Sequence, residues 1–276
     1  MNTAEPFDAN AFHEFERAGW EGASAFYVDA FAGLTRQTAT DLLDAVGAGP
    51  GIRLLDVATG PGFIAAAAAA RGAEVVGIDF SPAMIATATQ THPGVAFRED
   101  DAEALAFESG RFDAVVMNFG LLHLARPEAA LSEARRVLRR GGRYAFTIWA
   151  PPERAVGFGM VLRAVNALGQ SQVPLPEGPP FFRFSDRDEC TRALEASGFG
   201  DVEVRELPLE WRVTSAGAVF DALSRGGVRT AAVLRAQTPE ALTAIQGAVR
   251  AEVKRYARDG AFVIPMPAVL ASATAD

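Results

Sequence analysis

The sequence predicts an α/β protein built on a doubly wound, Rossmann-like sheet of seven mostly parallel strands. Between residues 51 and 150, apolar strand-like runs alternate with helix-forming segments, the order that builds a parallel sheet with right-handed crossovers. The first run, Ile52–Val57, leads through the glycine turn Thr59–Gly62 into an alanine-rich stretch that favours a helix. A strand, a glycine turn and a helix in this order direct free backbone N–H groups at a ligand.

The composition limits the classes of protein to which the chain can belong. The chain has 276 residues, of which 49% are hydrophobic and 22% charged, so it can bury a substantial core. Its net charge of −8 argues against a broad nucleic-acid surface and favours a small-molecule partner. The single cysteine, Cys190, fits a reducing compartment, and we find neither a signal peptide nor an apolar run of the ~20 residues that span a membrane. We therefore expect a cytoplasmic protein.

The remaining elements follow from apolar periodicity and from start and stop residues. A short helix is expected at 9–17, and further helices at 35–46, 63–71, 127–140, 185–197, 215–223 and 239–256. Ser81 and Pro82 mark a further helix start, and Ser185 with Asp188 resembles a capping box. Strands are expected at 52–57, 74–78, 95–99, 112–117, 143–149 and 202–207. Pro265 and Pro267 make 261–270 an edge-like or bulged last strand.

These elements predict one domain with four parts. Residues 1–50, rich in aromatics, form an N-terminal helical cap, and residues 51–150 form the cofactor-binding core. Residues 151–184 form a lid or substrate loop, because six prolines and four glycines fall between 151 and 180. Residues 185–276 complete the sheet and carry a helical insertion.

Three acids identify the ligand of the glycine turn. Gly60-Pro61-Gly62-Phe63-Ile64-Ala65 matches the dinucleotide pattern G-x-G-x-x-A, which alone is a weak signal. Asp56, Asp79 and Asp101 end the first three strands, and Asp56 would repel a pyrophosphate. A nucleoside with a cationic tail suits all three acids. S-adenosylmethionine, with its ammonium, sulfonium, ribose diol and adenine, has that chemistry.

The segments LDVATGPG, GIDFSPAMI, DAEALAF, FDAVVMNFGLLHL and LRRGGRYAFTIW resemble the successive motifs of class I S-adenosylmethionine-dependent methyltransferases. The resemblance is nearest to the small-molecule type that includes quinone-biosynthesis methyltransferases, and it covers Leu54–Trp149. Beyond it, FSDRDECTRALEASGFGDVEV is similar to the family's late helix and strand. Ala58 departs from the family pattern, which has its first glycine there.

The resemblance implies a set of contacts with S-adenosylmethionine and its product S-adenosylhomocysteine, and no metal. Asp56 would hold the amino group, and Asp79 the ribose hydroxyls. The other implied contacts are the methionine part with Ala58, Gly60, Pro61 and Gly62, the adenine faces with Phe80 and Met84, the adenine edge with Asp101 and Ala102, and the sulfonium with Asn118 and Phe119.

Methyl transfer needs mainly an in-line approach, and a general base helps only where the acceptor loses a proton. His123 is the best candidate for that base; the alternative is a histidine packed in LLHL and hydrogen-bonded to backbone. The sequence lacks the N/D-P-P-Y/F pattern of nucleic-acid amino-methylating enzymes, so a small apolar or aromatic O- or C-acceptor is expected. The candidate pocket residues are Phe12, Trp20, Tyr27, Trp149 and Phe158, with Arg183 for an acidic group.

Three alternatives stay open at this point. A NAD-dependent oxidoreductase would use the same turn, although the sequence has no Y-x-x-x-K. A non-catalytic interaction subunit would use the aromatic cap as a dimer patch, and a homodimer is also compatible with an active enzyme. An aminopropyl transferase would use the decarboxylated cofactor, for which Asp56 would be less useful.

Overall fold

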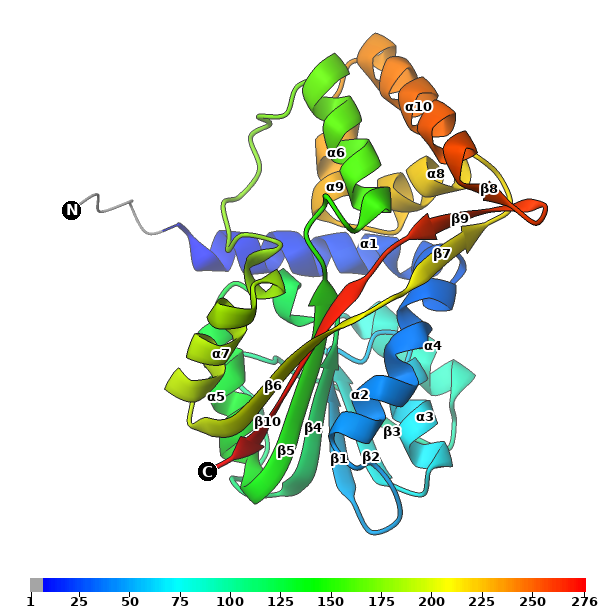
Figure 1. Cartoon of the computed structure of the whole chain (residues 1–276). Coiled ribbons are helices and arrows are strands. Elements are labelled where there is room, and N and C mark those ends of the chain that lie inside the picture. The colour runs from blue at the N-terminus through cyan, green and yellow to red at the C-terminus, as the bar shows by residue number, and fades with distance from the viewer. Residues whose placement is uncertain (1–6) are drawn as a thin grey trace.

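The structure, a computed structural model, describes residues 7–276 and contains a seven-stranded sheet of order β3-β2-β1-β4-β5-β10-β6 (Figure 1). The strands are β1 (Arg53–Val57), β2 (Glu74–Asp79), β3 (Ala96–Glu99), β4 (Phe112–Asn118), β5 (Leu138–Trp149), β6 (Phe199–Leu207) and β10 (Ala268–Ala275). The first five strands of this order, from β3 through β2, β1 and β4 to β5, pair in parallel, and β10 runs antiparallel to both β5 and β6. The predicted mostly parallel sheet is confirmed.

Helices cover both faces of this sheet. They are α2 (Ala39–Ala45), α3 (Phe63–Ala70), α4 (Pro82–Thr91), α5 (Pro127–Val137) and α7 (Arg187–Ala196). In Figure 1, α5 and α7 lie on one side, and α2, α3 and α4 on the other. Ser81 caps α4 and Pro82 is its first residue, as predicted. The capping box at Ser185 and Asp188 was wrong, because Asp186 caps α7 by accepting from Glu189 N at 2.9 Å.

The N-terminal cap is one long helix, α1 (Ala9–Thr35), followed by the 3₁₀ turn η1 (Arg36–Thr38). The predicted helix of residues 9–17 was too short. No proline interrupts α1, and Gly19 does not end the helix but lets Val228 pack closely against it. A Cβ at Gly19 would lie 2.3 Å from Val228 Cγ1. Figure 1 shows α1 crossing the carboxyl edge of the sheet. Its Glu21 accepts from Ser81 Oγ at 2.8 Å, which fixes α1 to the start of α4.

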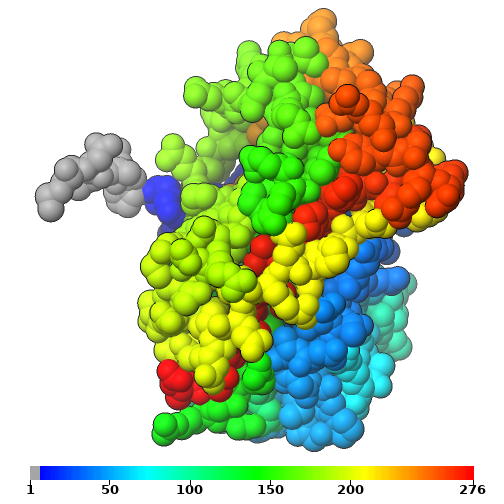
Figure 2. All heavy atoms as spheres, in the orientation of Figure 1, coloured from blue at the N-terminus to red at the C-terminus, as the bar shows by residue number. Residues whose placement is uncertain are grey.

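A second layer, the C-terminal cap, lies beyond α1. It contains α6 (Val156–Leu168), α8 (Ala218–Arg225), α9 (Arg229–Arg235), α10 (Pro239–Val253) and a small sheet of β7 (Glu210–Val213), β9 (Ala261–Pro265) and β8 (Ala257–Arg258). Short 3₁₀ turns stand at η2 (Leu121–His123), η3 (Arg183–Ser185) and η4 (Lys254–Tyr256). Figure 2 shows the C-terminal cap, in green and orange-red, resting on the part that carries the large sheet. No helix in the described part of the chain is long and apolar enough to cross a membrane.

Two predicted boundaries were wrong for identifiable reasons. The range 261–270 covers β9 and the start of β10, and its edge alternative was wrong: Pro265 ends β9 and Pro267 precedes β10, so every N–H from Ala268 onward is available to pair on both sides. A bulge-like shift of register does occur in β10, but between Ser272 and Thr274, beyond the predicted range. The helix expected to reach Arg140 ends at Val137, because Leu138 already pairs with Phe112 in the sheet.

The core between β5 and α7 contains a polar group without a partner. Tyr144 is fully buried and stacks on Phe199, with ring centroids 5.4 Å apart. Its hydroxyl has no hydrogen-bond partner among the described residues, and burial raises the pKa of the phenol. A buried polar group of this kind lowers stability.

Tyr144→Phe should therefore raise the free energy of unfolding by about 1–3 kcal/mol, because it removes the unpartnered hydroxyl and keeps the stacked ring. Urea titration measures the change, with the half-buried Tyr256→Phe as the control. A loss of stability in Tyr144→Phe would show that the hydroxyl has a bonding partner.

Candidate functional site

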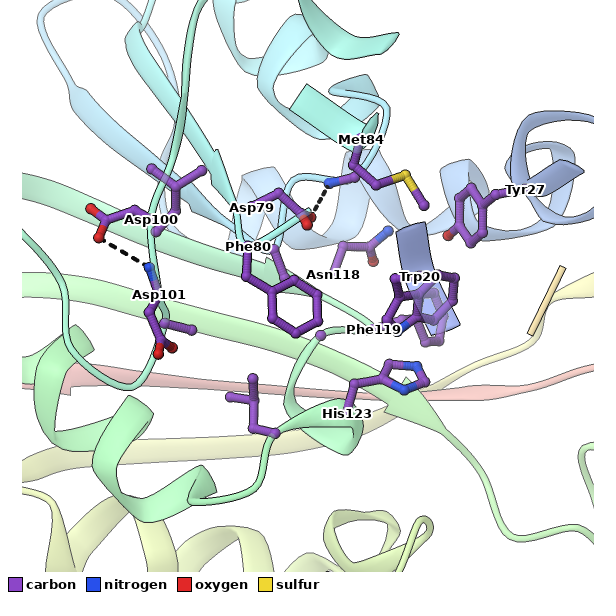
Figure 3. Close-up of a pocket in the computed structure, with 16 residues that line it drawn as sticks. Trp20, Tyr27, Asp79, Phe80, Met84, Asp100, Asp101, Asn118, Phe119 and His123 are labelled. Atoms are coloured by element: carbon purple, nitrogen blue, oxygen red, sulfur yellow. Dashed lines mark hydrogen bonds between the residues drawn. The ribbon is translucent and has the colours of Figure 1, made fainter. Parts of the chain in front are cut away.

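A cavity of about 630 Å³ lies at the carboxyl ends of β1, β2 and β4, beneath α1. Its walls come from five segments that are far apart in the sequence. They are Trp20, Tyr27, Ala58, Gly60, Ile78, Asp79, Phe80, Met84, Asp100, Asp101, Ala102, Asn118, Phe119, Gly120, His123 and Leu124. In Figure 3, Asp100 and Asp101 lie on one side of this cofactor cavity, and Trp20, Tyr27 and His123 on the other.

The glycine turn is built by left-handed backbone. Gly60 and Gly62 have φ of 53° and 81°, and Ala58 has φ of 54°, which costs an alanine about 1–2 kcal/mol. A Cβ at Gly60 would meet no atom within 4 Å, so the turn leaves open space beside the cavity. Gly62 lines no cavity; a Cβ there would lie 2.6 Å from the ring of Phe97. Ala58 thus keeps the conformation that the family pattern assigns to glycine.

Asp79 ties the turn to the second strand. Its Oδ2 accepts from Gly60 N at 2.9 Å and its Oδ1 from Ser81 N at 3.0 Å. The side chain is 6% exposed, and burial raises its pKa to about 6. Both oxygens retain lone pairs, and the residue lines the cofactor cavity.

Asp56 lies beneath the turn. Its Oδ2 accepts from Thr59 Oγ1 at 2.6 Å and from Ala65 N at 3.0 Å, while Oδ1 has no partner among the described residues. Burial raises its pKa to about 7. Asp56 and Arg36 line an adjoining cavity of about 340 Å³, which shares Tyr27, Ala58, Gly60 and Asn118 with the cofactor cavity. An unpartnered buried carboxylate oxygen fits an ammonium group or a bridging water.

Asn118 ends β4 and Phe119 follows it; hydrogen bonds hold Asn118 in place, whereas aromatic stacking holds Phe119. Asn118 accepts from Thr38 Oγ1 at 2.8 Å and Thr147 Oγ1 at 2.6 Å, and donates to Thr35 O at 3.2 Å. Phe119 has φ of 55° and stacks on Trp149, with centroids 4.0 Å apart. Asn118 therefore joins the end of α1 to the sheet, and Phe119 forms a wall of the cavity.

A second cavity, of about 490 Å³, adjoins the first and shares Trp20, Tyr27, Phe119 and His123 with it. We call it the acceptor cavity. Its other walls are Phe31, Thr35, Trp149, Phe158, Phe181, Leu223, Gly226, Gly227, Val228, Arg229 and Thr230. Seven of its fifteen lining residues are Phe, Trp or Tyr. The cavity is thus suited to a flat apolar molecule.

His123 stands where the two cavities meet. Its Nδ1 lies 2.9 Å from Oε2 of Glu16, and the ring makes edge contacts with Trp20 and Phe181. Glu16 is fully buried, and its Oε1 accepts from Arg229 Nε at 2.8 Å. Burial acts to raise the pKa of Glu16, but His123 and Arg229 together hold it below its usual value. The histidine is hydrogen-bonded through its ring to a carboxylate, and not to backbone as the alternative expected.

The structure brings most of the predicted residues together and leaves three elsewhere: Gly62, described above, Phe12 and Arg183. Phe12 and Arg183 line neither cavity: Phe12 packs on Gly178 and the Arg229 guanidinium, and Arg183 pairs with Glu128 and Glu189. Pro61 lines the cavity of Asp56, and Phe80, Met84, Asp101 and Ala102 line the cofactor cavity. Sequence reasoning missed Glu16, Arg36, Phe181 and Arg229, because no local pattern marks them.

Comparison with known proteins agrees with this geometry. A family model described as a methyltransferase domain matches residues 55–146. The demethylmenaquinone methyltransferase of Beutenbergia cavernae is 38% identical over 161 residues, covering 56% of this chain and 67% of that protein. That of Renibacterium salmoninarum is 34% identical and covers 63% and 78%. Phosphoethanolamine N-methyltransferase 2 of Haemonchus contortus, solved with S-adenosyl-L-methionine, has the same fold, with a TM-score of 0.55, 18% identity and coverage of 95% of this chain and 59% of that one.

The chain belongs to the class I S-adenosylmethionine-dependent methyltransferases, and S-adenosylmethionine is its methyl donor. Within that class it is related to the enzymes of quinone biosynthesis. These findings do not favour an oxidoreductase or a non-catalytic subunit. The aromatic residues Trp20 and Tyr27, which a dimer patch would expose, face the two cavities.

Asp56→Asn should stabilise the protein without its cofactor. The folded-state pKa of Asp56, about 7, lies above the ordinary value of 3.8, so ionising this buried acid destabilises the fold as the pH rises. The gain from Asn should grow between about pH 4 and 7, reach about 4 kcal/mol because each unit of the pKa difference corresponds to ~1.4 kcal/mol, and stay constant above pH 7.

Urea titration at several pH values measures this gain. The control is Asp101→Asn, because Asp101 lies at the cavity but is half-buried. A gain for Asp56→Asn that is independent of pH would contradict the assigned burial effect.

Proposed function

We propose that the methyl acceptor is a small aromatic molecule that carries an ionisable hydroxyl, with hydroquinones as the leading class. The observation that carries the proposal is the aromatic acceptor cavity, which meets the cofactor cavity at Trp20, Phe119 and His123. Its aromatic walls suit a flat ring system. The names of the two demethylmenaquinone methyltransferase relatives support the same class.

In this proposal the cofactor lies across the carboxyl edge of the sheet. Asp79 accepts from the ribose hydroxyls, and Asp101 with the backbone of Ala102 reads the adenine edge between Phe80 and Met84. Ala58, Gly60, Pro61 and Gly62 form the turn that holds the methionine part. Its ammonium lies at the unpartnered oxygen of Asp56, and Arg36 is the cation for its carboxylate, since the guanidinium makes no ion pair among the described residues.

Asn118 and Phe119 stand beside the position of the sulfur. When bound, S-adenosylmethionine supplies a methyl group that its sulfonium makes electrophilic. The residues of the chain then have to align the acceptor with that methyl, and positioning of this kind supplies about 7–11 kcal/mol. Trp149 and Phe158 hold the flat ring, Phe181 from the loop between α6 and α7 closes the cavity, and His123 is the general base.

A screen with labelled methyl donor tests the acceptor class. Reduced 1,4-naphthohydroquinone, simple phenols and the corresponding aromatic hydrocarbons would be offered at equal concentration, and labelled products identified by mass spectrometry. We expect label on hydroxyl-bearing aromatics alone. Transfer to aliphatic amines, with none to phenols or hydroquinones, would contradict the proposal.

Asp79→Ala should weaken cofactor binding. The variant loses two charge-assisted hydrogen bonds of about 1.5–3 kcal/mol each, partly replaced by water, so the affinity for S-adenosylhomocysteine should fall about 10–1000-fold. Calorimetric titration measures it. Glu74→Ala, at the exposed opposite end of the same strand, is the control and should bind as wild type. Unchanged affinity in folded Asp79→Ala would remove the ribose assignment.

A further inference from the structure

We infer that Glu16 is the positioning residue of the reaction: it holds His123 as the Nδ1–H tautomer, with Nε2 free to take the proton of the acceptor hydroxyl. This rests on the proposed function of His123 and assigns a role to the N-terminal helix. The geometry is the juxtaposition of a fully buried carboxylate, 2.9 Å from Nδ1, with a ring that borders both cavities.

The tautomer follows from the charge on Glu16. A carboxylate can only accept a hydrogen bond, so the nitrogen at 2.9 Å has to carry the proton. In a neutral imidazole the other nitrogen then has the free lone pair. Nε2 makes no hydrogen bond to any described residue, and the side chain keeps 14% of its exposure, on the side of the cavities. Nε2 is therefore the basic atom.

Arg229 is the second partner of Glu16, and with His123 it holds the pKa of Glu16 below its usual value. Its Nε donates to Glu16 Oε1 at 2.8 Å, and its two other nitrogens donate to Pro179 O at 2.8 Å and Leu122 O at 2.9 Å. The guanidinium also stacks over Phe12 at 4.4 Å. All of its nitrogens are thus used by the protein, and Arg229 is a fixed counter-ion of Glu16.

The proton and the electrons are accounted for at named atoms. The acceptor hydroxyl passes its proton to Nε2 of His123, and the oxygen, or the ring carbon that it activates, attacks the methyl carbon and displaces sulfur with the carbon–sulfur electron pair. Attack through carbon also releases the proton of that ring carbon to water. The imidazolium that forms carries a positive charge next to the carboxylate of Glu16, which stabilises it. After product release, Nε2 returns the proton to water.

Nitrogen NMR of histidine-labelled wild-type protein tests the tautomer without any activity measurement. The chain has three histidines, and the signals missing from His123→Gln identify His123. We expect the neutral ring to be protonated at Nδ1. A ring protonated at Nε2 would overturn the inference, whatever the acceptor proves to be.

Steady-state kinetics with 1,4-naphthohydroquinone tests the role of the carboxylate. Glu16→Gln should lower kcat on the order of 10–1000-fold. It should leave KM for the acceptor and calorimetric affinity for S-adenosylhomocysteine within about threefold of wild type. The double variant with His123→Gln should be no slower than His123→Gln alone, because the two residues act as one unit. Glu14→Gln, on the exposed side of the same helix, is the control and should keep wild-type kcat.

The outcomes separate this inference from the proposed function. Wild-type turnover in His123→Gln would remove the general base, and with it the function assigned to His123. Loss of kcat in His123→Gln but not in Glu16→Gln would leave the base and overturn the role of Glu16. A parallel fall in stability, cofactor affinity and kcat in Glu16→Gln would show a structural role instead, and would also overturn the inference.

Discussion

The structure depends on two carboxylates that are buried without a protein cation at the carboxyl edge of a parallel sheet. Asp56 and Asp79 are 0% and 6% exposed, and burial raises their pKa values to about 7 and 6. Backbone N–H groups of the glycine turn and of two helix starts are their main donors. This arrangement lowers the stability of the free protein and favours a ligand with positive charge, because a cation offsets the desolvation cost of the buried carboxylates. A diphosphate would add like-charge repulsion instead.

The helix α1 converts this open sheet edge into an enclosed site. Glu21 fixes its middle to Ser81, and Asn118 fixes its end through Thr35 and Thr38. Trp20 and Tyr27 then form a partition between the cofactor cavity and the acceptor cavity, and line both. An enclosed site of low polarity strengthens the interaction of each charged group and keeps water from competing for the methyl group. The same helix therefore contributes walls to both cavities.

The sequence predicted the parts of the site that local chemistry determines. Asp56, Asp79 and the glycine turn fall at strand ends, where backbone geometry alone requires small residues and leaves donors free. Glu16 and Arg229 could not be found in this way: they are 213 positions apart, and each looks like an ordinary charge on a helix. Their meeting depends on how α8 of the C-terminal cap packs on α1 and α9 on α8, which no local periodicity encodes. For the same reason β10 was predicted at an edge, because its central position depends on partners distant in sequence.

The pairing of Glu16 with Arg229 explains why a buried acid and a buried base can share one site. Arg229 Nε donates to Oε1 of Glu16 at 2.8 Å, so the carboxylate that contacts His123 also has a permanent cation beside it. A proton taken up by Nε2 adds one positive charge to the three side chains, which the acidic edge formed by Asp56 and Asp79 tolerates. The charge that favours binding of a cationic methyl donor thus also favours the proton transfer that accompanies methyl transfer.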